Sequence, residues 1–234
     1  MPSDKVVLIT AASQGIGHAI AKELAVRGWK VSLLARSAKI ETIGKELGGL
    51  GVTGDVTSSE DLRRFIDATL KHFGSIDAVV NNTGHPAKAD LSALTDAQWQ
   101  EGYDLILSSV IRLTRLIMPH MIKQKCGAFV NISSYAAKKP ELERPVSSVM
   151  RAALSAWTRL HAEQAAPHGI RVNSVLPGFV DSYPAGDAII KTIPMGRIGR
   201  LQELAKVVLF LLSDEASFIT GQNLLVDGGM VRTL

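Results

Sequence analysis

A short segment near the amino terminus has the residue types that a phosphate-binding loop needs. Thr10-Ala-Ala-Ser-Gln-Gly-Ile-Gly17 follows an apolar run and opens a segment with helical periodicity. Residues without bulky side chains let backbone N–H groups and a helix N-terminus approach a pyrophosphate closely. A loop of this kind between a strand and a helix predicts a dinucleotide site. The residues expected to contact the nucleotide here are Thr10, Ser13, Gln14, Gly15, Ile16 and Gly17.

A basic residue, Arg36, stands at the end of the second apolar run, 36 − 17 = 19 residues after Gly17. At this place an acidic residue would hydrogen-bond the ribose hydroxyls of NAD, whereas a basic one accommodates a 2′-phosphate. A guanidinium binds phosphate through two parallel hydrogen bonds. Arg36 therefore predicts a preference for NADP(H) over NAD(H), the alternative being an ordinary surface arginine.

Short apolar runs alternate with longer helical patterns along the whole chain. The nearly continuous hydrophobicity of the runs is typical of strands covered on both faces, as in a parallel sheet. The expected strands are Val6–Thr10, Val31–Ala35, Gly51–Asp55, Ala78–Asn81, Ala128–Ser133, Arg171–Leu176 and Leu224–Asp227. The expected helices are Gly15–Arg27, Ala38–Leu47, Ser59–Phe73, Asp96–Lys123, Val149–His168 and Leu201–Ser213. This order predicts an α/β fold: a single-domain, Rossmann-type doubly wound parallel sheet of about seven strands, with helices on both faces.

The composition fits one domain over residues 1–234. Of these 234 residues, 46% are hydrophobic, which is enough for a single core. The formal charge is +4, and the basic residues are scattered rather than grouped with aromatic ones. We therefore expect small anionic molecules as ligands, and no nucleic acid. No spacing of His, Cys and Asp suggests a metal site.

Three features predict a cytoplasmic protein. Cys126 is the only cysteine, so an internal disulfide is impossible and a reducing compartment is favoured. Because Cys126 precedes an apolar run, we expect it to be a small buried side chain. Residues 1–5 lead directly into a strand, so no signal peptide is expected. No uncharged apolar run approaches the length of a membrane span, so we expect no membrane contact.

The motifs of the chain resemble those of the short-chain dehydrogenase/reductase family almost from end to end. They are Thr10–Gly17, similar to its TGxxxGxG loop; Asn81–Gly84, similar to NNAG; Pro177-Gly178, similar to its PG turn; and Ile219–Gln222 with Val226–Gly229, similar to its C-terminal signature. Ala11 replaces the first glycine of the family's loop. Because alanine disfavours a positive φ, we expect that turn to be either slightly different or slightly strained.

The resemblance implies further cofactor contacts. Asp55 and Val56 match the family's pair beside the adenine, and Asn82 and Gly84 match the wall beside the adenosine ribose. Gln14 stands where relatives that prefer NADP often have a second basic residue. The remaining cofactor-contacting positions are expected at Arg151, Pro177, Gly178 and Val180, with Ser182 near the place of a threonine that contacts the nicotinamide carboxamide.

The family's four catalytic positions are largely changed. Ser134 matches the serine that fixes the carbonyl, but 147 − 134 = 13 residues later the expected tyrosine is Ser147, and four residues further the expected lysine is Arg151. Ile106 stands where the resemblance places an asparagine that orients a water relay. An aliphatic hydroxyl is a far weaker acid than a phenol, and arginine is not a proton reservoir. The resemblance therefore implies an altered chemistry in which another group supplies the proton.

Tyr135, next to Ser134, is the first candidate for that proton donor. Some dienoyl-CoA reductases of the superfamily carry serine at the usual tyrosine position and use a tyrosine from this loop, although they keep the lysine. A packed aromatic facing away from the cleft is the alternative. Tyr183 and His85 are weaker candidates, and the simpler interpretation of His85 is a solvent-facing loop histidine.

The chain is short where relatives place a substrate lid. Only 194 − 178 = 16 residues separate Gly178 from Pro194, so the lid near 179–193 is expected to be small. A small lid leaves the substrate pocket open and less able to exclude water.

Three functions remain open at this level. The first is an atypical NADP(H)-dependent oxidoreductase acting on a carbonyl or a conjugated enone or enoyl group, with Ser134, Tyr135, Ser147 and Arg151 at its active site. The second is a non-catalytic NADP(H)-binding protein. The third resembles the halohydrin dehalogenases, to which Arg151 points, although the missing tyrosine and the phosphate loop argue against it.

We also expect a homo-oligomer, a tetramer or a dimer. The apolar residues of two long helices exceed what one side of a single sheet needs, which suggests a subunit contact. These residues are Val110, Leu113, Ile117, Ala153, Trp157 and Leu160.

Overall fold

A computed structural model describes residues 4–182 and 184–232 of the chain. Seven parallel strands form one sheet in the order β3-β2-β1-β4-β5-β6-β7. The strands are β1 (Val6–Thr10), β2 (Lys30–Ala35), β3 (Leu50–Thr53), β4 (Ala78–Asn81), β5 (Gly127–Ile132), β6 (Ile170–Pro177) and β7 (Asn223–Val226). The helices are α1 (Gly15–Val26), α2 (Lys39–Glu46), α3 (Ser59–Phe73), α4 (Asp96–Tyr103), α5 (Ser109–Gln124), α6 (Pro145–Ala165), α7 (Asp187–Ile190) and α8 (Leu201–Leu212). The predicted fold class is confirmed.

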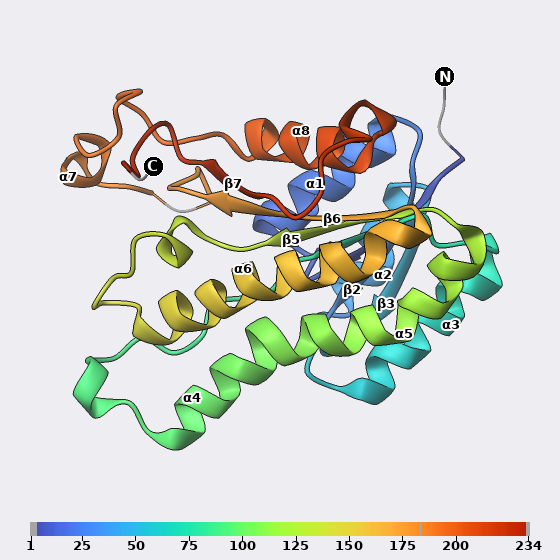
Figure 1. Cartoon of the computed structure of the whole chain (residues 1–234), viewed down its shortest axis with the longest axis horizontal. Helices are drawn as coiled ribbons and strands as arrows, with labels where there is room; N and C mark the ends of the chain where they lie inside the picture. Colours follow the sequence, from blue (N-terminus) through green and yellow to red (C-terminus); the bar gives the residue numbers. More distant parts are fainter. Residues whose placement is uncertain (1–3, 183, 233–234) are drawn as a thin grey trace.

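The strands send alternate side chains into two separate cores. Val7 and Ile9 of β1 pack with α1, α2 and α8, whereas Leu8 between them packs with α3 and α5. This alternation follows from the two-residue period of a strand, and burial on both faces explains why most strand positions are apolar. Figure 1 shows the same layers, with α1 and α8 on one side of the sheet and α3, α5 and α6 on the other. Each helix layer therefore packs against one face of the sheet and holds the strands in place from that side.

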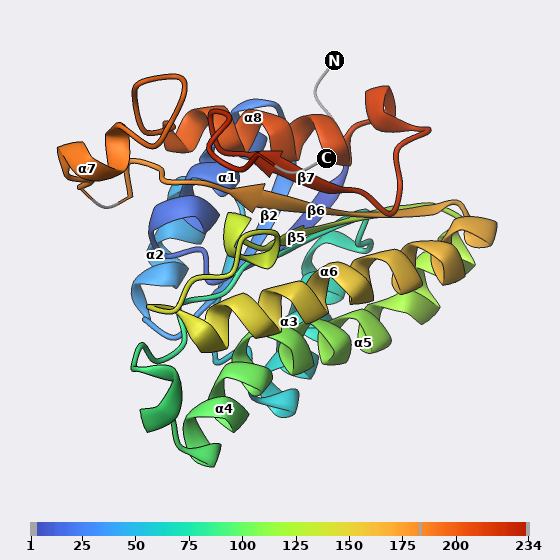
Figure 2. The same ribbon diagram turned by 60° about the vertical axis from the view of Figure 1, so that its left-hand side comes forward.

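The order of the strands reverses between β1 and β4, because β1 leads through β2 to one edge and β4 leads to the other. In open α/β sheets, a crevice forms at such a reversal, outside the carboxyl ends of the strands. In Figures 1 and 2, α4 and α7 both extend beyond this end of the sheet, which the loops after the strands also occupy.

Local signals position α3 and α6. The Ser58 side chain accepts a hydrogen bond from the backbone N–H of Asp61, and Gly74 ends α3 in the left-handed conformation. Helix α6 begins at Pro145, four residues before the predicted start at Val149. Proline suits the first helical position because its missing N–H has no partner there in any helix. Ser147 therefore lies within the first turn of α6.

The predicted helix Asp96–Lys123 is interrupted. Between α4 and α5, residues Asp104–Ser108 form a π-helical turn, which adds one residue to the turn. By length and composition, the continuous stretch Asp96–Gln124 resembles a membrane-spanning helix, and 44% of its most apolar window is buried inside the protein. Core helices pass the same test, and the buried residues of α5 pack on the sheet.

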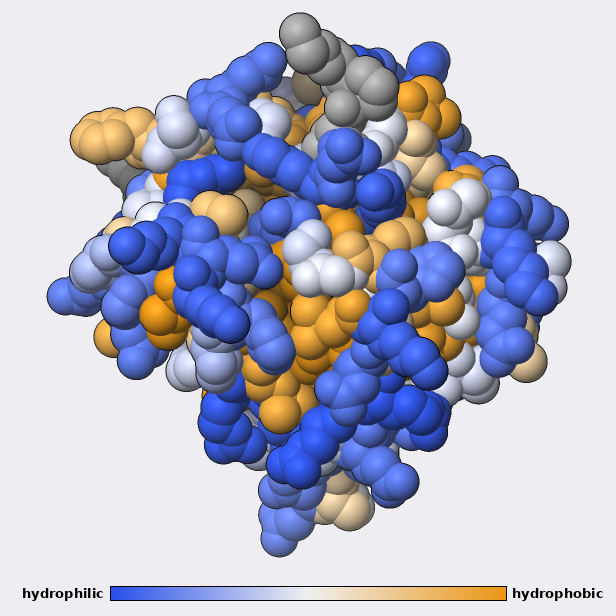
Figure 3. All heavy atoms as spheres, turned by 90° about the vertical axis from the view of Figure 1, so that its right-hand side faces the viewer, coloured by the Kyte–Doolittle hydropathy of each residue, from blue (hydrophilic) through white to orange (hydrophobic). Residues whose placement is uncertain are grey.

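One sequence-based expectation about burial is wrong, and another is wrong for three of its six residues. Cys126 is exposed, because it lies before β5 and only the strand that follows it enters the core. Val110, Leu113 and Ile117 are buried within this chain and leave no surplus for a partner. Figure 3 shows the end of the molecule at which the strands begin. Hydrophilic residues cover most of this face, and hydrophobic residues reach the surface in its centre.

Candidate cofactor cleft and active site

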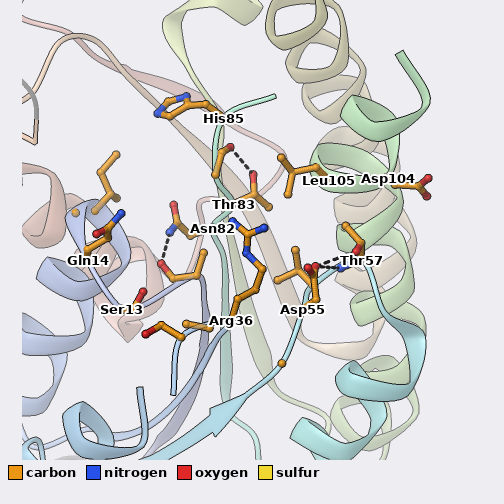
Figure 4. Close-up of a pocket in the computed structure, with 18 of the residues that line it drawn as sticks. Ser13, Gln14, Arg36, Asp55, Thr57, Asn82, Thr83, His85, Asp104 and Leu105 are labelled. Atoms are coloured by element: carbon orange, nitrogen blue, oxygen red, sulfur yellow. Dashed lines mark hydrogen bonds between the residues drawn. The ribbon is translucent and has the colours of Figure 1, made fainter. Parts of the chain in front are cut away.

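A cleft of about 1080 Å³ lies at the carboxyl ends of β1, β2, β3 and β4. Nine predicted cofactor residues line it: Ser13, Gln14, Gly15, Ile16, Arg36, Asp55, Val56, Asn82 and Gly84. Figure 4 shows how they converge, with Ser13 and Gln14 on one wall, Asp55 on the other and Arg36 between them. The cleft is large enough for a dinucleotide, since small-molecule sites commonly occupy about 300–1,000 Å³.

The loop after β1 keeps the shape expected of a phosphate-binding turn. Ala11 adopts φ +49°, and Gly15 adopts φ +57° with no atom near the place of a Cβ. A Cβ on Gly17 would lie 2.6 Å from the Ala11 carbonyl oxygen and 2.7 Å from Asn82 Nδ2. The first turn is thus left-handed despite its alanine, so of the two expectations the strained turn is the correct one.

Thr10 and Asn82 tie the loop to the neighbouring strand. The Thr10 hydroxyl donates to the Asn82 carbonyl oxygen at 2.6 Å and accepts from the Asn82 backbone N–H at 3.0 Å. The Asn82 side chain donates from Nδ2 to the carbonyl oxygen of Ala11 at 3.1 Å. These three bonds hold the ends of β1 and β4 together. Thr10 and Gly17 therefore do not line the cleft; they pack beneath its wall and hold the loop in place.

The part of the cleft after β2 and β3 contains a cation without a described partner and a carboxylate fixed by hydrogen bonds. The exposed Arg36 forms no hydrogen bond or ion pair with any residue that the structure describes. Asp55 Oδ1 instead accepts from the backbone N–H of Thr57 at 2.9 Å and from its hydroxyl at 2.8 Å. The bonds to Thr57 fix the loop after β3, while Arg36 keeps all its donors for a ligand.

The outer wall comes from residues that the sequence analysis did not identify. Arg112 of α5 donates to the Thr57 carbonyl oxygen at 2.7 Å and to Asp104 Oδ1 at 3.1 Å. Glu101, Asp104, Leu105 and Arg112 all line the cleft. The π-helical turn brings Asp104 and Arg112 to the same side, a placement that regular helical spacing does not predict.

Ser147 and Arg151 lie together at the carboxyl end of β5. Arg151 is only 4% exposed; its Nε donates to Ser147 Oγ at 3.2 Å and its Nη1 to the Ile132 carbonyl oxygen at 3.0 Å. Burial lowers the pKa of Arg151 to about 10, which leaves it charged at neutral pH. Neither side chain forms part of the wall of the cleft. The pair is thus a buried cation joined to a hydroxyl.

Ile106 lies in the π-helical turn and is 1% exposed. It packs with Val110 of α5 and Leu154 of α6. An isoleucine has no group that binds water, and its burial among apolar side chains leaves no room for one to be ordered by it. The position supplies packing between helices.

Tyr135 and Ser134 follow β5, and both hydroxyl groups already have partners. Ser134 Oγ accepts from the backbone N–H of Ala136 at 3.2 Å. Tyr135 OH donates to Glu141 Oε1 at 2.5 Å, and its ring lies 5.5 Å from that of Phe179. Burial, then the hydrogen bond and the negative charge of Glu141, raise the pKa of Tyr135 above its ordinary value. Glu141 gave no signal in the sequence because it belongs to an irregular loop.

Of the remaining predicted positions, His85 and Ser182 line the cleft. His85 lines the cleft with an exposed side chain, and partial burial followed by the charges of Arg151, Arg144 and Lys88 lowers its pKa. Ser182 also lines the cleft, whereas Tyr183 lies outside the described residues. Gly178 packs against Asp227, and Val180 pairs with Gly199 as an isolated bridge.

The described residues include no group of three or more His, Cys, Asp and Glu side chains arranged for a metal ion. The polar side chains that face the cleft are instead hydroxyls, amides, two arginines, His85 and the carboxylates of Asp55, Glu101 and Asp104. Such groups suit a ligand rich in phosphate and ribose. A nicotinamide dinucleotide fits the residues that are present.

Comparison with known proteins gives the same relationship over nearly the whole chain. A family profile described as "Enoyl-(Acyl carrier protein) reductase" matches residues 10–231. The protein named "3-oxoacyl-[acyl-carrier-protein] reductase FabG" from Salmonella typhimurium is 37% identical over 238 residues, 97% of each chain. Its namesakes from Escherichia coli and Thermotoga maritima are 36% and 33% identical, over 97% of this chain and 97% and 98% of theirs. This chain therefore belongs to the short-chain dehydrogenase/reductase family of oxidoreductases.

Proposed function

We propose that this protein binds NADP(H) and uses it to reduce a carbonyl or a conjugated enoyl group. The observation that carries the proposal is Arg36, an unpaired cation that extends into the cleft beside Asn82 and opposite Asp55. A guanidinium with all its donors available is suited to a 2′-phosphate. Gln14, Gly15 and Gly17 supply the loop and helix N-terminus for the pyrophosphate.

The residues at the family's catalytic positions support an electrostatic contribution to this reaction. Bound NADPH would supply a hydride to the substrate carbon, which leaves negative charge on the substrate oxygen. Arg151 places a positive charge close to the substrate oxygen. Ser147 accepts a hydrogen bond from Arg151, so its own hydroxyl proton is available to another acceptor. Fixed donors and charges of this kind stabilise a developing oxyanion.

The source of the proton is the least ordinary part of the proposal. Tyr135 stays a candidate, but its hydroxyl donates to Glu141 and its raised pKa makes it a weaker acid. Among the described residues of the lid segment, the one helix is the four-residue α7, so we infer that solvent can reach the substrate. We infer that water delivers the proton to the oxygen after Arg151 has stabilised its charge.

The substrate class follows from the relatives. Their names describe reductases of 3-oxoacyl groups, and the family profile names an enoyl reductase. Both groups place the new negative charge on an oxygen, directly or through conjugation, so one cationic site serves either. We propose that the enzyme acts on such a substrate in the cytoplasm.

A second function is favoured by one specific observation. Ser147, Arg151 and Tyr135 all have internal partners, as they would in a protein that binds NADP(H) without turning it over. A lyase of the halohydrin dehalogenase kind is less well supported, because such enzymes use no nucleotide and this chain keeps the phosphate loop.

Nicotinamide absorbance during turnover tests the activity across ketones, enones, 3-oxoacyl thioesters and enoyl thioesters. Calorimetry tests the cofactor: we expect wild type to bind NADPH more tightly than NADH. Arg36→Leu should remove most of that preference, a loss of about 1.5–3 kcal/mol for a charged hydrogen bond. Arg63→Leu, an exposed arginine of α3, is the matched control and should change nothing. Equal affinity of wild type for the two nucleotides would refute the assignment.

We also propose a homo-oligomer, now on the α6 residues of the expected set together with Val149. Val149 and Leu160 of α6 are 51% and 64% exposed, and Ala153 and Trp157 lie on the same helix face between them. Residues spaced by three or four positions form one stripe of a helix. An exposed apolar stripe on the outer helix layer is suited to a second copy of the chain.

A further inference from the structure

A network of side chains joins α5 to the loop between β3 and α3. Arg112 of α5 donates from Nη1 to the Thr57 carbonyl oxygen at 2.7 Å. Its Nη2 donates to Asp104 Oδ1 at 3.1 Å, and Asp104 Oδ2 accepts from Gln100 Nε2 at 2.9 Å. A carboxylate held by two donors orients the guanidinium that it pairs with. The π-helical turn therefore aims Arg112 at the loop.

The loop needs support because it follows the edge of the sheet. Strand β3 stands at one end of the strand order, beside β2, and all four of its residues are half-buried. Within the loop, Asp55 Oδ1 accepts from the backbone N–H and the hydroxyl of Thr57, and the Asp55 backbone N–H donates to Asp61 Oδ2 at 2.8 Å. These bonds fix the loop to itself and to α3. Arg112 adds the bond that ties Thr57 to α5.

The same loop forms one wall of the cleft. Asp55, Val56 and Thr57 line the cleft together with Leu105 and Arg112. Figure 4 shows Asp55 and Thr57 joined by hydrogen bonds on this wall, with Leu105 above them. In the proposed complex with NADP(H), this wall faces the adenine, as the resemblance implies for Asp55 and Val56. Its position should therefore affect the affinity for the nucleotide.

We propose that Arg112 is a positioning residue for the nucleotide, because it fixes the loop after β3 so that the adenine wall is formed before NADP(H) binds. This role rests on the proposed binding of the cofactor. A loop that must be ordered on binding reduces affinity, whereas a pre-formed wall avoids that cost. Arg112 bonds to Thr57, whereas the 2′-phosphate is assigned to Arg36. Loss of Arg112 should therefore weaken NADPH and NADH by the same factor.

Calorimetry of Arg112→Met with NADPH and with NADH tests this role. Methionine keeps an unbranched apolar side chain but has no N–H donor. We expect both dissociation constants to rise by the same factor, about tenfold for a lost hydrogen bond from a charged group, so that the preference for NADPH persists. Arg36→Leu should do the opposite and remove the preference. Unchanged affinity of Arg112→Met for both nucleotides, or a loss confined to NADPH, would overturn the inference.

Two further variants and a control exclude a general effect on the fold. Arg112→Lys keeps a charged donor for one of the two acceptors and should recover part of the lost affinity; a lysine variant as weak as Arg112→Met would count against the inference. Asp104→Asn removes the charge that orients Arg112 and should weaken both nucleotides by a smaller factor. If Arg112→Met does not fold, unchanged affinity in Asp104→Asn overturns the inference. Arg115→Met changes an exposed arginine of the same helix and should leave both affinities unchanged.

Turnover separates this role from the chemistry. The loop after β3 and the Ser147–Arg151 pair at β5 have β2, β1 and β4 between them in the sheet. In an active enzyme, Arg112→Met should therefore raise the KM for NADPH and change kcat at saturating NADPH far less. A fall in kcat as large as the rise in KM would refute the positioning role.

The outcomes also distinguish this role from the proposed function. If Arg112→Met weakens both nucleotides but the wild type reduces no ketone, enone or enoyl thioester, the positioning role stands and the reductase proposal fails. If the wild type is active and Arg112→Met binds both nucleotides as tightly, the reductase proposal stands and the positioning role fails. If the wild type binds neither nucleotide, both fail.

Discussion

The strained turn at Ala11 leads to the sharpest prediction. Its φ of +49° costs a residue with a Cβ about 1–2 kcal/mol, and glycine avoids that cost. Against this, glycine loses about 0.4–1 kcal/mol more than alanine through the entropy of the unfolded chain. Ala11→Gly should therefore stabilise the protein by about 0.5–1 kcal/mol. For a chain of this size, that raises Tm by about 1–4 °C.

The next residue is a matched control. Ala12 is fully buried and is not among the described residues with a positive φ. Ala12→Gly loses a buried methyl group, about 0.8 kcal/mol, and has the same entropic cost without any relief of strain. It should destabilise the protein by about 1–2 kcal/mol. Scanning calorimetry of both variants gives the comparison, and a lower Tm for Ala11→Gly would show that the turn is not strained.

Three further perturbations test the site and the assembly. Tyr135→Phe should keep turnover within about tenfold of wild type, because Glu141 already holds the hydroxyl; a loss of about 10²–10⁴-fold would identify Tyr135 as the general acid. Burial lowers the pKa of His161 to about 4, so its neutral form stabilises the fold above pH 6.5 and this contribution is lost as the pH falls from 6.5 through 4. Chemical denaturation should show about 2.5 kcal/mol less stability at pH 4.5 than at pH 7.5 from this group, and His161→Phe should remove that part of the dependence; equal slopes in both proteins would refute it. Leu160→Lys should convert an oligomer into a smaller species in light scattering, and a monomeric wild type would rule the assembly out.

The sequence was sufficient for the sheet because its central strands are buried on both faces. A continuous apolar run such as Val6–Ile9, followed by a glycine-containing loop and a helix, is typical of a central strand in a parallel sheet. The same reasoning found Arg36, since its position relative to the loop is fixed by the length of one helix and one strand. Features that depend on local, regular geometry were therefore predictable.

Features that depend on irregular geometry were not. A regular helix would place Asp104 and Arg112 about 80° apart, and only the extra residue of the π-helical turn brings them together on the cleft wall. The bond between Tyr135 and Glu141 joins two loop residues with no periodic relationship. Cys126 was misplaced because its apolar neighbours are on one side only, where β5 begins.

Cys126 also has a practical consequence. It is a single exposed thiol at the amino end of β5, whereas the cleft opens at the carboxyl ends of the strands, ~20 Å away along a six-residue strand. A maleimide reagent would therefore attach at one defined point and leave the mouth of the cleft unobstructed. Molecules tethered to a sensor surface through this thiol would all present the same face to solution, and in the proposed homo-oligomer a dye carried there would report subunit exchange by energy transfer.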